Sequence, residues 1–81
     1  MQAKEIETRI AAALPGSRVV VRSEDDTHFE ALVVAPQFAG QRPLQRHQLV
    51  YASLGAAVGH EIHALSIVAH TPEEWAARGG G

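Results

Sequence analysis

The feature that most constrains the fold is an amphipathic stretch that lies between two apolar runs. In the first run Phe29, Ala31 and Val33 alternate with other residues, and the second run spans residues 62–69. The stretch between them, residues 43–58, carries apolar residues at helical spacing: Val50, Tyr51, Leu54, Ala57 and Val58. Gly55 and Gly59 lie four apart; they either allow close approach to the sheet or mark where the helix frays and stops, and we favour the second. Two strands that are joined by a helix pair in parallel through a right-handed crossover. We therefore predict a parallel strand pair with a helix packed across it.

Residues 62–69 carry apolar side chains at both alternating positions, which is typical of a strand covered on one face and flanked by other strands. His63 stands near the start of this run. A ring nitrogen held there by rigid neighbours can bind a metal, or it can simply hydrogen-bond a backbone carbonyl. Spacing alone favours the hydrogen bond, because one histidine does not make a metal site.

The chain before the alternating run predicts one helix and a hairpin. Residues 3–14 have an apolar stripe with charged residues opposite, and a proline and a glycine follow them. Residues 17–22 alternate with a half-polar pattern that indicates an edge strand. The polar residues 23–27 then connect to a second strand that begins at His28, which predicts an antiparallel pair.

The C-terminal part predicts one more helix. Thr71, Pro72 and Glu74 form a capping-box pattern, and Trp75 is expected to hold the short helix against the sheet. Residues 79–81, all glycine, are expected to be a flexible tail. The fold class is thus α+β, a single domain over residues 1–81 with a three-stranded mixed sheet and helices mainly on one face.

Composition excludes several classes of function. The chain has 81 residues, a formal net charge of −2 and no cysteine, so it offers neither a globally basic surface for nucleic acid nor a thiolate metal site of its own. No apolar run approaches the length of a membrane span, and the first ten residues lack the pattern of a signal peptide. We expect a cytoplasmic protein with no membrane contact. It is not expected to be an enzyme, because no nucleophile–base pair or phosphate-binding loop is recognisable.

Five short stretches occur in an order that points to one family. They are His28-Phe29-Glu30; Phe38-Ala39-Gly40; Leu44-Gln45-Arg46-His47 with Val50-Tyr51; Ile62-His63-Ala64-Leu65-Ser66-Ile67; and Thr71-Pro72-Glu73-Glu74-Trp75. Together they resemble the BolA family, particularly its short bacterial IbaG-like branch, over nearly the whole chain. The resemblance implies a fold related to type II KH domains, with the order αββααβα and an extra helical turn near residues 37–40.

The resemblance also implies a function and a cofactor. BolA proteins are partners of monothiol glutaredoxins with a Cys-Gly-Phe-Ser motif, with which they share a [2Fe-2S] cluster in iron–sulfur trafficking or iron homeostasis. His63 matches the ligand histidine of the family, and the glutaredoxin with its glutathione supplies the sulfur. Two histidines can replace two thiolates on one iron, so a chain without cysteine can complete such a site. No cluster is expected in the isolated chain.

The second ligand is left open by the sequence. The family takes it from the loop between the first two strands, as cysteine or histidine, but residues 23–27 contain neither. His28 follows directly and either reaches the cluster or faces solvent at the strand edge. Asp25 or Asp26 as an oxygen ligand is a poor match to iron–sulfur chemistry.

The three other histidines are expected to be structural. His47 is predicted to lean toward the core, His60 to lie at a helix end, and His70 to lie in a turn. We assign none of them to metal.

The alternative function is a stress-responsive transcriptional regulator that binds DNA. Arg42, Gln45 and Arg46 line the start of the long helix and are the candidate contacts, but a solvated helix face is the favoured explanation of these residues. The acidic net charge and the missing Gly-x-x-Gly loop of KH domains argue against this function. The sequence leaves open whether the free chain forms a weak homodimer.

Overall fold

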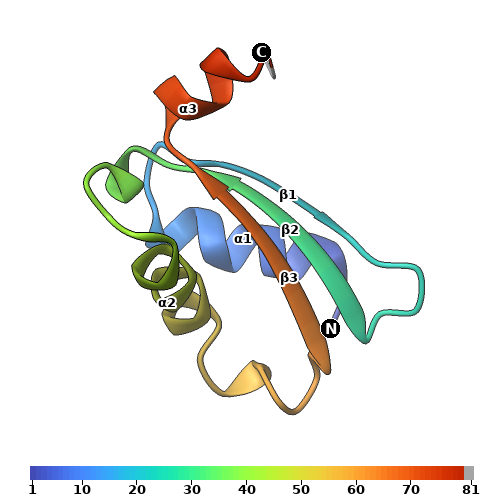
Figure 1. Ribbon diagram of the computed structural model, residues 1–81. Helices are drawn as coiled ribbons and strands as arrows, with labels where there is room; N and C mark the ends of the chain where they lie inside the picture. Colours follow the sequence, from blue (N-terminus) through green and yellow to red (C-terminus); the bar gives the residue numbers. More distant parts are fainter. Residues whose placement is uncertain (80–81) are drawn as a thin grey trace.

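The computed structural model describes residues 1–79 as a three-stranded sheet with three α-helices and two short 3₁₀ turns (Figure 1). The elements in chain order are α1 (Ala3–Ala13), β1 (Arg18–Arg22), β2 (His28–Val34), η1 (Pro36–Phe38), α2 (Pro43–Leu54), η2 (Gly55–Ala57), β3 (Ala64–His70) and α3 (Pro72–Ala77). This is the α+β architecture predicted from the sequence. Gly79 follows α3 in a turn, and the rest of the predicted tail lies outside the described residues. Within those 79 residues, no helix is long and apolar enough to cross a bilayer.

The sheet has the order β1-β2-β3, with β1 antiparallel to β2 and β2 parallel to β3. The mixed sheet, the edge position of β1 and the helical crossover are therefore confirmed. The prediction that residues 62–69 form a strand flanked on both sides is wrong, because within residues 1–79 β3 pairs only with β2 and begins at Ala64. Alternate β3 residues such as Val68, which is 50% exposed, face away from α1 and α2. Apolar residues of both parities thus marked an edge strand here.

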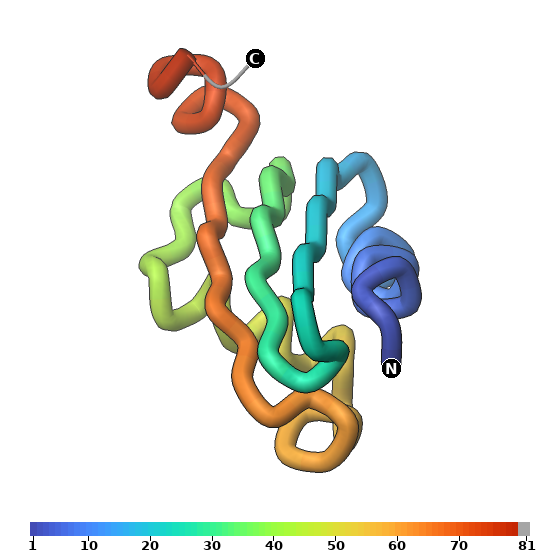
Figure 2. The backbone as a smooth tube through the Cα atoms, turned by 90° about the vertical axis from the view of Figure 1, so that its right-hand side faces the viewer, coloured from blue at the N-terminus to red at the C-terminus, as the bar shows by residue number. Residues whose placement is uncertain are grey.

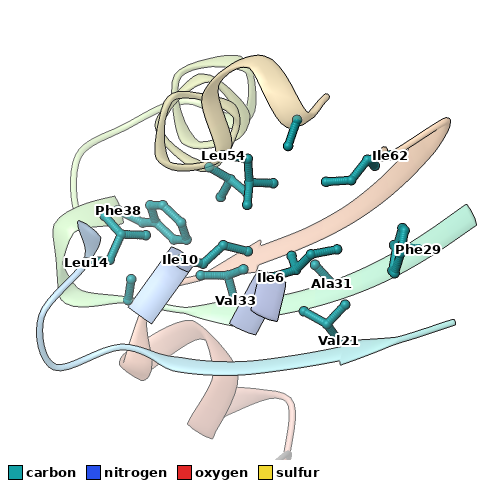
Figure 3. Packing of buried hydrophobic residues seen from close by; sticks show 13 residues of the cluster. Ile6, Ile10, Leu14, Val21, Phe29, Ala31, Val33, Phe38, Leu54 and Ile62 are labelled. Carbon is teal, nitrogen blue, oxygen red and sulfur yellow. The ribbon is translucent and has the colours of Figure 1, made fainter. Parts of the chain in front are cut away.

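The core lies between one face of the sheet and the helices α1 and α2 (Figure 3). Ile6 and Ile10 of α1 and Val50 of α2 are fully buried, as is Val33 of the central strand. These positions follow the helical and alternating spacings that the sequence carries. Figure 2 shows the two ends of the sheet: the β1–β2 turn and the start of β3 lie at one end, and α3 lies at the other.

Helix α2 is shorter than the apolar spacing predicts. It ends at Leu54 because Gly55 takes a positive φ of 58°, a backbone conformation that glycine adopts without strain. Ala57 and Val58 reach the core from η2 and its end instead of from the helix. Tyr51, which the spacing places on the apolar stripe, is 40% exposed. The apolar spacing therefore overextends the helix to residue 58, whereas the expectation that the glycines mark its end is confirmed at Gly55.

The extra helical turn expected near residues 37–40 is present as η1, one residue earlier. Pro36 occupies its first turn, and Phe38 is fully buried in the core. This short turn therefore fills the space between the end of β2 and α2 with an aromatic ring.

The N-terminus of α3 is capped as the sequence predicts. Thr71 Oγ1 accepts a hydrogen bond from the backbone N–H of Glu74 at 3.1 Å, and the Thr71 N–H donates to Glu74 Oε1 at 3.0 Å. Trp75 is half-buried and lies 5.7 Å from His70 between ring centroids. Together with Leu32 and Val68 it lines a hollow on the face of the sheet that α1 and α2 leave open.

Arg46 ties α3 to the rest of the domain. Its guanidinium binds both carboxylate oxygens of Glu74, at 2.6 and 3.0 Å, and also donates to the carbonyls of Gln41 and Ala69 at 2.9 and 3.2 Å. The bond from Arg46, helped by the Thr71 N–H, lowers the pKa of Glu74 to about 2. We call Arg46, Thr71 and Glu74 the clasp.

Candidate functional site

His28 and His63 meet at the end of the sheet opposite α3. His28 is the first residue of β2 and stands opposite Ala64, the first residue of β3, in the parallel register. His63 directly precedes Ala64 in a bend, so the two imidazoles lie side by side with centroids 6.4 Å apart and planes inclined by 27°. The structure therefore brings together the two histidines that were predicted as ligands.

The carbonyl of Thr27 fixes this junction. It accepts hydrogen bonds from the backbone N–H groups of His63 at 2.8 Å and of Ala64 at 3.3 Å. Because Thr27 immediately precedes His28, the same peptide segment that carries one imidazole holds the backbone of the other. Parallel pairing and this carbonyl together place both rings at the same end of the sheet.

Asp25 organises the turn between β1 and β2. Its Oδ1 accepts hydrogen bonds from the N–H groups of His28 at 2.9 Å and of Thr27 at 3.0 Å, and its Oδ2 lies 2.7 Å from Nδ1 of the His28 ring. The His28 N–H lowers the pKa of Asp25 most, followed by the Thr27 N–H and the imidazole, so the carboxylate is ionised. Asp25 therefore holds both the backbone of the turn and the ring of His28.

Both histidines are exposed, and the site is open. The His28 side chain is 65% exposed, and an open hollow of about 620 Å³ lies beside it on the face of the sheet that the helices leave uncovered. The hollow is lined by Arg22, Ser23, Glu24, Asp25, His28, Phe29, Glu30, Ala64 and Ser66. A ligand on a second protein can thus approach both rings from solvent.

The arrangement supplies two nitrogen donors and no more. No group of three or more histidine, cysteine, aspartate or glutamate side chains that could hold a metal ion occurs in residues 1–79. Asp25 and Asp26 were considered as oxygen ligands, but both Asp25 oxygens are engaged within the turn, and Asp26 is an exposed loop residue with φ 59°. The donor set suits part of a coordination shell whose other ligands come from elsewhere.

The remaining histidines lie at different places from one another. His47 is half-buried on α2, as predicted. His60 does not lie at the end of an α-helix but in a turn after η2, where its N–H binds the carbonyl of Ala57. His70 is the last residue of β3 and not part of a turn; its Nδ1 lies 3.8 Å from Glu74.

The structure separates the three residues that were considered for nucleic-acid contact. Arg42 and Gln45 are exposed at the start of α2, where Gln45 Oε1 accepts from the Arg42 N–H at 2.9 Å. The Arg46 side chain is only 12% exposed and is bound to Glu74 in the clasp. The guanidinium that was expected to face a duplex is thus already paired within the protein.

Sequence reasoning missed the roles of Asp25 and Thr27. Asp25 was considered only as a poor oxygen ligand, whereas it holds the backbone and the ring of His28. A signal for this was present, since an aspartate that accepts hydrogen bonds from N–H groups two and three residues later is the pattern of an Asx turn.

Comparisons with known proteins agree on one family. The family model described as BolA-like protein matches residues 7–74. Human BolA-like protein 1 is 39% identical over 79 residues, which cover 86% of this chain and 58% of the human protein, so the chain spans little more than half of that relative. The DNA-binding transcriptional regulator BolA of Haemophilus influenzae is 42% identical over 53 residues, covering 65% of this chain and 52% of that protein. The solved structure of a BolA homologue from Coxiella burnetii superposes with a TM-score of 0.82 at 42% identity and covers 94% of this chain and 97% of that one.

Proposed function

This chain belongs to the BolA-like protein family, and from that premise we propose that it is the partner of a monothiol glutaredoxin with a Cys-Gly-Phe-Ser motif. In this proposal the two proteins share a [2Fe-2S] cluster that this chain ligates through histidine, as a step in iron–sulfur cluster trafficking and iron homeostasis. The cluster is cargo that passes through the complex. The chain acts as an adaptor and not as an enzyme.

One observation carries the proposal: the imidazoles of His28 and His63 lie side by side at an exposed end of the sheet. A histidine pair placed only for stability would gain little there, because exposed rings bury little surface. Exposure is instead what a shared ligand site requires, since the partner must reach the same metal.

The chemistry of the donor set fits a shared cluster. A [2Fe-2S] cluster is usually held by four thiolates, but two histidines can replace the two thiolates on one iron. This chain has no cysteine, so its contribution is limited to such nitrogen ligands. The glutaredoxin cysteine and glutathione would provide the thiolates. The residues of this chain that would hold the cluster are His63 and His28, and the rest of the site would orient them.

Complex formation with a loaded glutaredoxin tests this function. Purified chain is titrated into a monothiol glutaredoxin that carries its cluster, and the visible absorption and circular dichroism are followed together with the size of the assembly. We expect a changed cluster spectrum and a heterodimer, and a variant with both His28→Ala and His63→Ala should lose the changed spectrum. An unaltered spectrum with the unmodified chain over the whole titration would overturn the proposal.

A second function, DNA-binding transcriptional regulation, is favoured by the names of two relatives. The proteins of Haemophilus influenzae and Vibrio cholerae that match this chain are both called DNA-binding transcriptional regulator BolA. On this chain Arg42 and Gln45 are the exposed polar residues at the start of α2 that a duplex would meet. The acidic net charge and the pairing of Arg46 with Glu74 make this the weaker proposal.

A further inference from the structure

We propose that Asp25 is a positioning residue that keeps the ring proton of His28 on Nδ1, so that Nε2 presents its lone pair at the site. The first half of this inference concerns the free chain alone. The second half, that the exposed lone pair is what the cluster binds, rests on the proposed function.

The short contact between Asp25 and His28 determines which ring nitrogen carries the proton. Asp25 Oδ2 lies 2.7 Å from His28 Nδ1. An ionised carboxylate has no proton to give and can only accept, so the hydrogen of this bond belongs to Nδ1. In a neutral imidazole the other nitrogen then has no proton. Thr27 Oγ1, which is 3.1 Å from the same Nδ1, is compatible with this assignment because a hydroxyl oxygen also accepts.

The carboxylate itself is held in one orientation. Its Oδ1 is occupied by the backbone N–H groups of Thr27 and His28, and Ser23 Oγ lies 3.3 Å from the same oxygen. The Ser23 hydroxyl in turn accepts from the Asp26 N–H at 2.9 Å and lies 2.6 Å from the carbonyl of His28. With Oδ1 fixed by the turn, only Oδ2 is left for the ring. The turn therefore sets the direction of the carboxylate as well as its place.

The contact with Asp25 matters for His28 because the rest of its ring is largely exposed to solvent. At 65% exposure an imidazole without a strong partner exchanges between its two tautomers and among several ring orientations. A carboxylate that accepts from the distal ring N–H is the usual way in which proteins orient a metal-binding histidine. Asp25 orients the His28 ring before any ligand is present. It leaves Nε2 as the nitrogen of His28 whose lone pair can bind a metal.

The competing explanation is that Asp25 only shapes the turn, and Asp25→Asn separates the two roles. The asparagine oxygen can still accept from the two backbone N–H groups, so the turn is retained. The amide nitrogen that replaces Oδ2 is a donor, however, and a donor facing Nδ1 requires the lone pair to be there. The variant should therefore move the ring proton to Nε2 without removing the turn.

Imidazole nitrogen resonances of the free, ¹⁵N-labelled chain test this first half directly. Long-range ¹H–¹⁵N correlations distinguish the two tautomers of a neutral imidazole from each other and from the doubly protonated ring, so the pH is raised until the doubly protonated pattern is absent. We expect the Nδ1–H pattern for His28 in the unmodified chain and the Nε2–H pattern in Asp25→Asn. The matched control is Asp26→Asn, one residue along the same turn, which should leave the His28 pattern unchanged. An Nε2–H pattern in the unmodified chain, or an unchanged pattern in Asp25→Asn, would overturn the inference.

Affinity for a glutaredoxin that carries its cluster tests the second half. We expect Asp25→Asn to bind the loaded partner about tenfold or more weakly, as is usual when the carboxylate behind a ligand histidine is removed, while Asp26→Asn binds normally. An inverted tautomer with unchanged affinity would show that the lone pair on Nε2 is not used. If the unmodified chain fails to change the cluster spectrum at all, the proposed function fails, whereas the tautomer result still stands or falls by the free chain.

Discussion

The two ends of the sheet use the same chemical device for different purposes. At the histidine end, Asp25 accepts from backbone N–H groups and holds the ring of His28. At the clasp, Glu74 accepts from the Thr71 N–H and holds the guanidinium of Arg46. In each case one carboxylate fastens a local backbone segment and one nitrogen-containing side chain.

The difference lies in what the held side chain can still reach. The Arg46 side chain is 12% exposed, and its N–H groups donate hydrogen bonds within the protein. The His28 side chain is 65% exposed, and only its Nδ1 is engaged by the contacts within the turn. A partly buried ion pair of this kind stabilises the position of a helix, and an exposed carboxylate–imidazole pair adds little to stability. A carboxylate thus contributes to stability where its partner is covered, and in the proposed function it orients a ligand where its partner is open.

The largest effect is expected from Arg46→Ala, which removes the centre of the clasp. The change deletes the bonds to Glu74 and to two backbone carbonyls, so we expect the free energy of unfolding to fall by about 2 kcal/mol. For a domain of this size the melting temperature should fall by roughly 10 °C. Urea unfolding monitored by circular dichroism measures the free energy of unfolding, and thermal unfolding measures the melting temperature.

The control for that experiment is Arg42→Ala, four residues earlier and exposed, which should leave the stability nearly unchanged. The comparison also requires that Arg46→Ala leave the His28 tautomer as it is in the unmodified chain. Equal stability of the two arginine variants would show that the clasp does not hold α3.

Thr71→Ala should have about half that effect. The threonine is 5% exposed and caps α3 by accepting from the Glu74 N–H, and removal of such a cap costs about 1 kcal/mol. Thr8→Ala is a suitable control, because the Thr8 hydroxyl donates to the Lys4 carbonyl on the exposed side of α1 and alanine is the better helix former. Thermal unfolding of both variants gives the difference, and a Thr71→Ala variant as stable as Thr8→Ala would contradict the capping role.

A smaller effect should appear as a pH dependence of stability. Arg46 lowers the pKa of Glu74 from 4.5 to about 2, so the contribution of this carboxylate is fully present above pH 4.5 and is lost as pH falls toward about 2. The unmodified chain should therefore be more stable than Glu74→Gln at neutral pH, and the gap should narrow through this window. Unfolding free energies of the two proteins across the acid range measure the gap. A gap that stays constant would show that the Glu74 carboxylate contributes nothing through its charge.

The smallest effect is expected for DNA binding. If the chain is an adaptor for a cluster, Arg42→Ala should not alter its affinity for duplex DNA at physiological salt, which fluorescence anisotropy measures. If it is a transcriptional regulator, the loss of one phosphate contact should weaken binding and make it less dependent on salt. A marked loss of affinity would shift the functional centre from the histidine end to the start of α2.

The sequence allowed the element order and the sheet topology to be predicted because both rest on local spacing and on general rules of connection. Three patterns carried these predictions: the alternation around Phe29, the helical spacing around Val50 and the cap at Thr71. Each pattern is formed by residues that lie close together in the chain. The ends of elements were predicted less well. Apolar spacing alone carried α2 past Gly55, whose positive φ ends the helix although glycine is a recognisable stop signal. The edge position of β3 depends on which strand lies in the middle of the sheet, which no local pattern contains.

The candidate site could be predicted in its residues but not in its geometry. His63 was a candidate from its place in the sequence, and the resemblance to the family favoured it and His28 as ligands. Their approach, however, depends on the parallel register of β2 and β3 and on the Thr27 carbonyl. Arg46 was assigned to the surface because its partner, Glu74, lies 28 positions away in the chain. Contacts of this range follow from packing, and spacing along the sequence does not reveal them.

The central claim is that the imidazole of His63 is a ligand of a cluster shared with a glutaredoxin. The most direct measurement is the visible circular dichroism of the loaded complex formed with His63→Ala, compared with His60→Ala, which removes an exposed histidine three residues earlier. We predict that His63→Ala loses the spectrum characteristic of the mixed complex and that His60→Ala retains it. A His63→Ala complex with the spectrum of the unmodified one would contradict the claim.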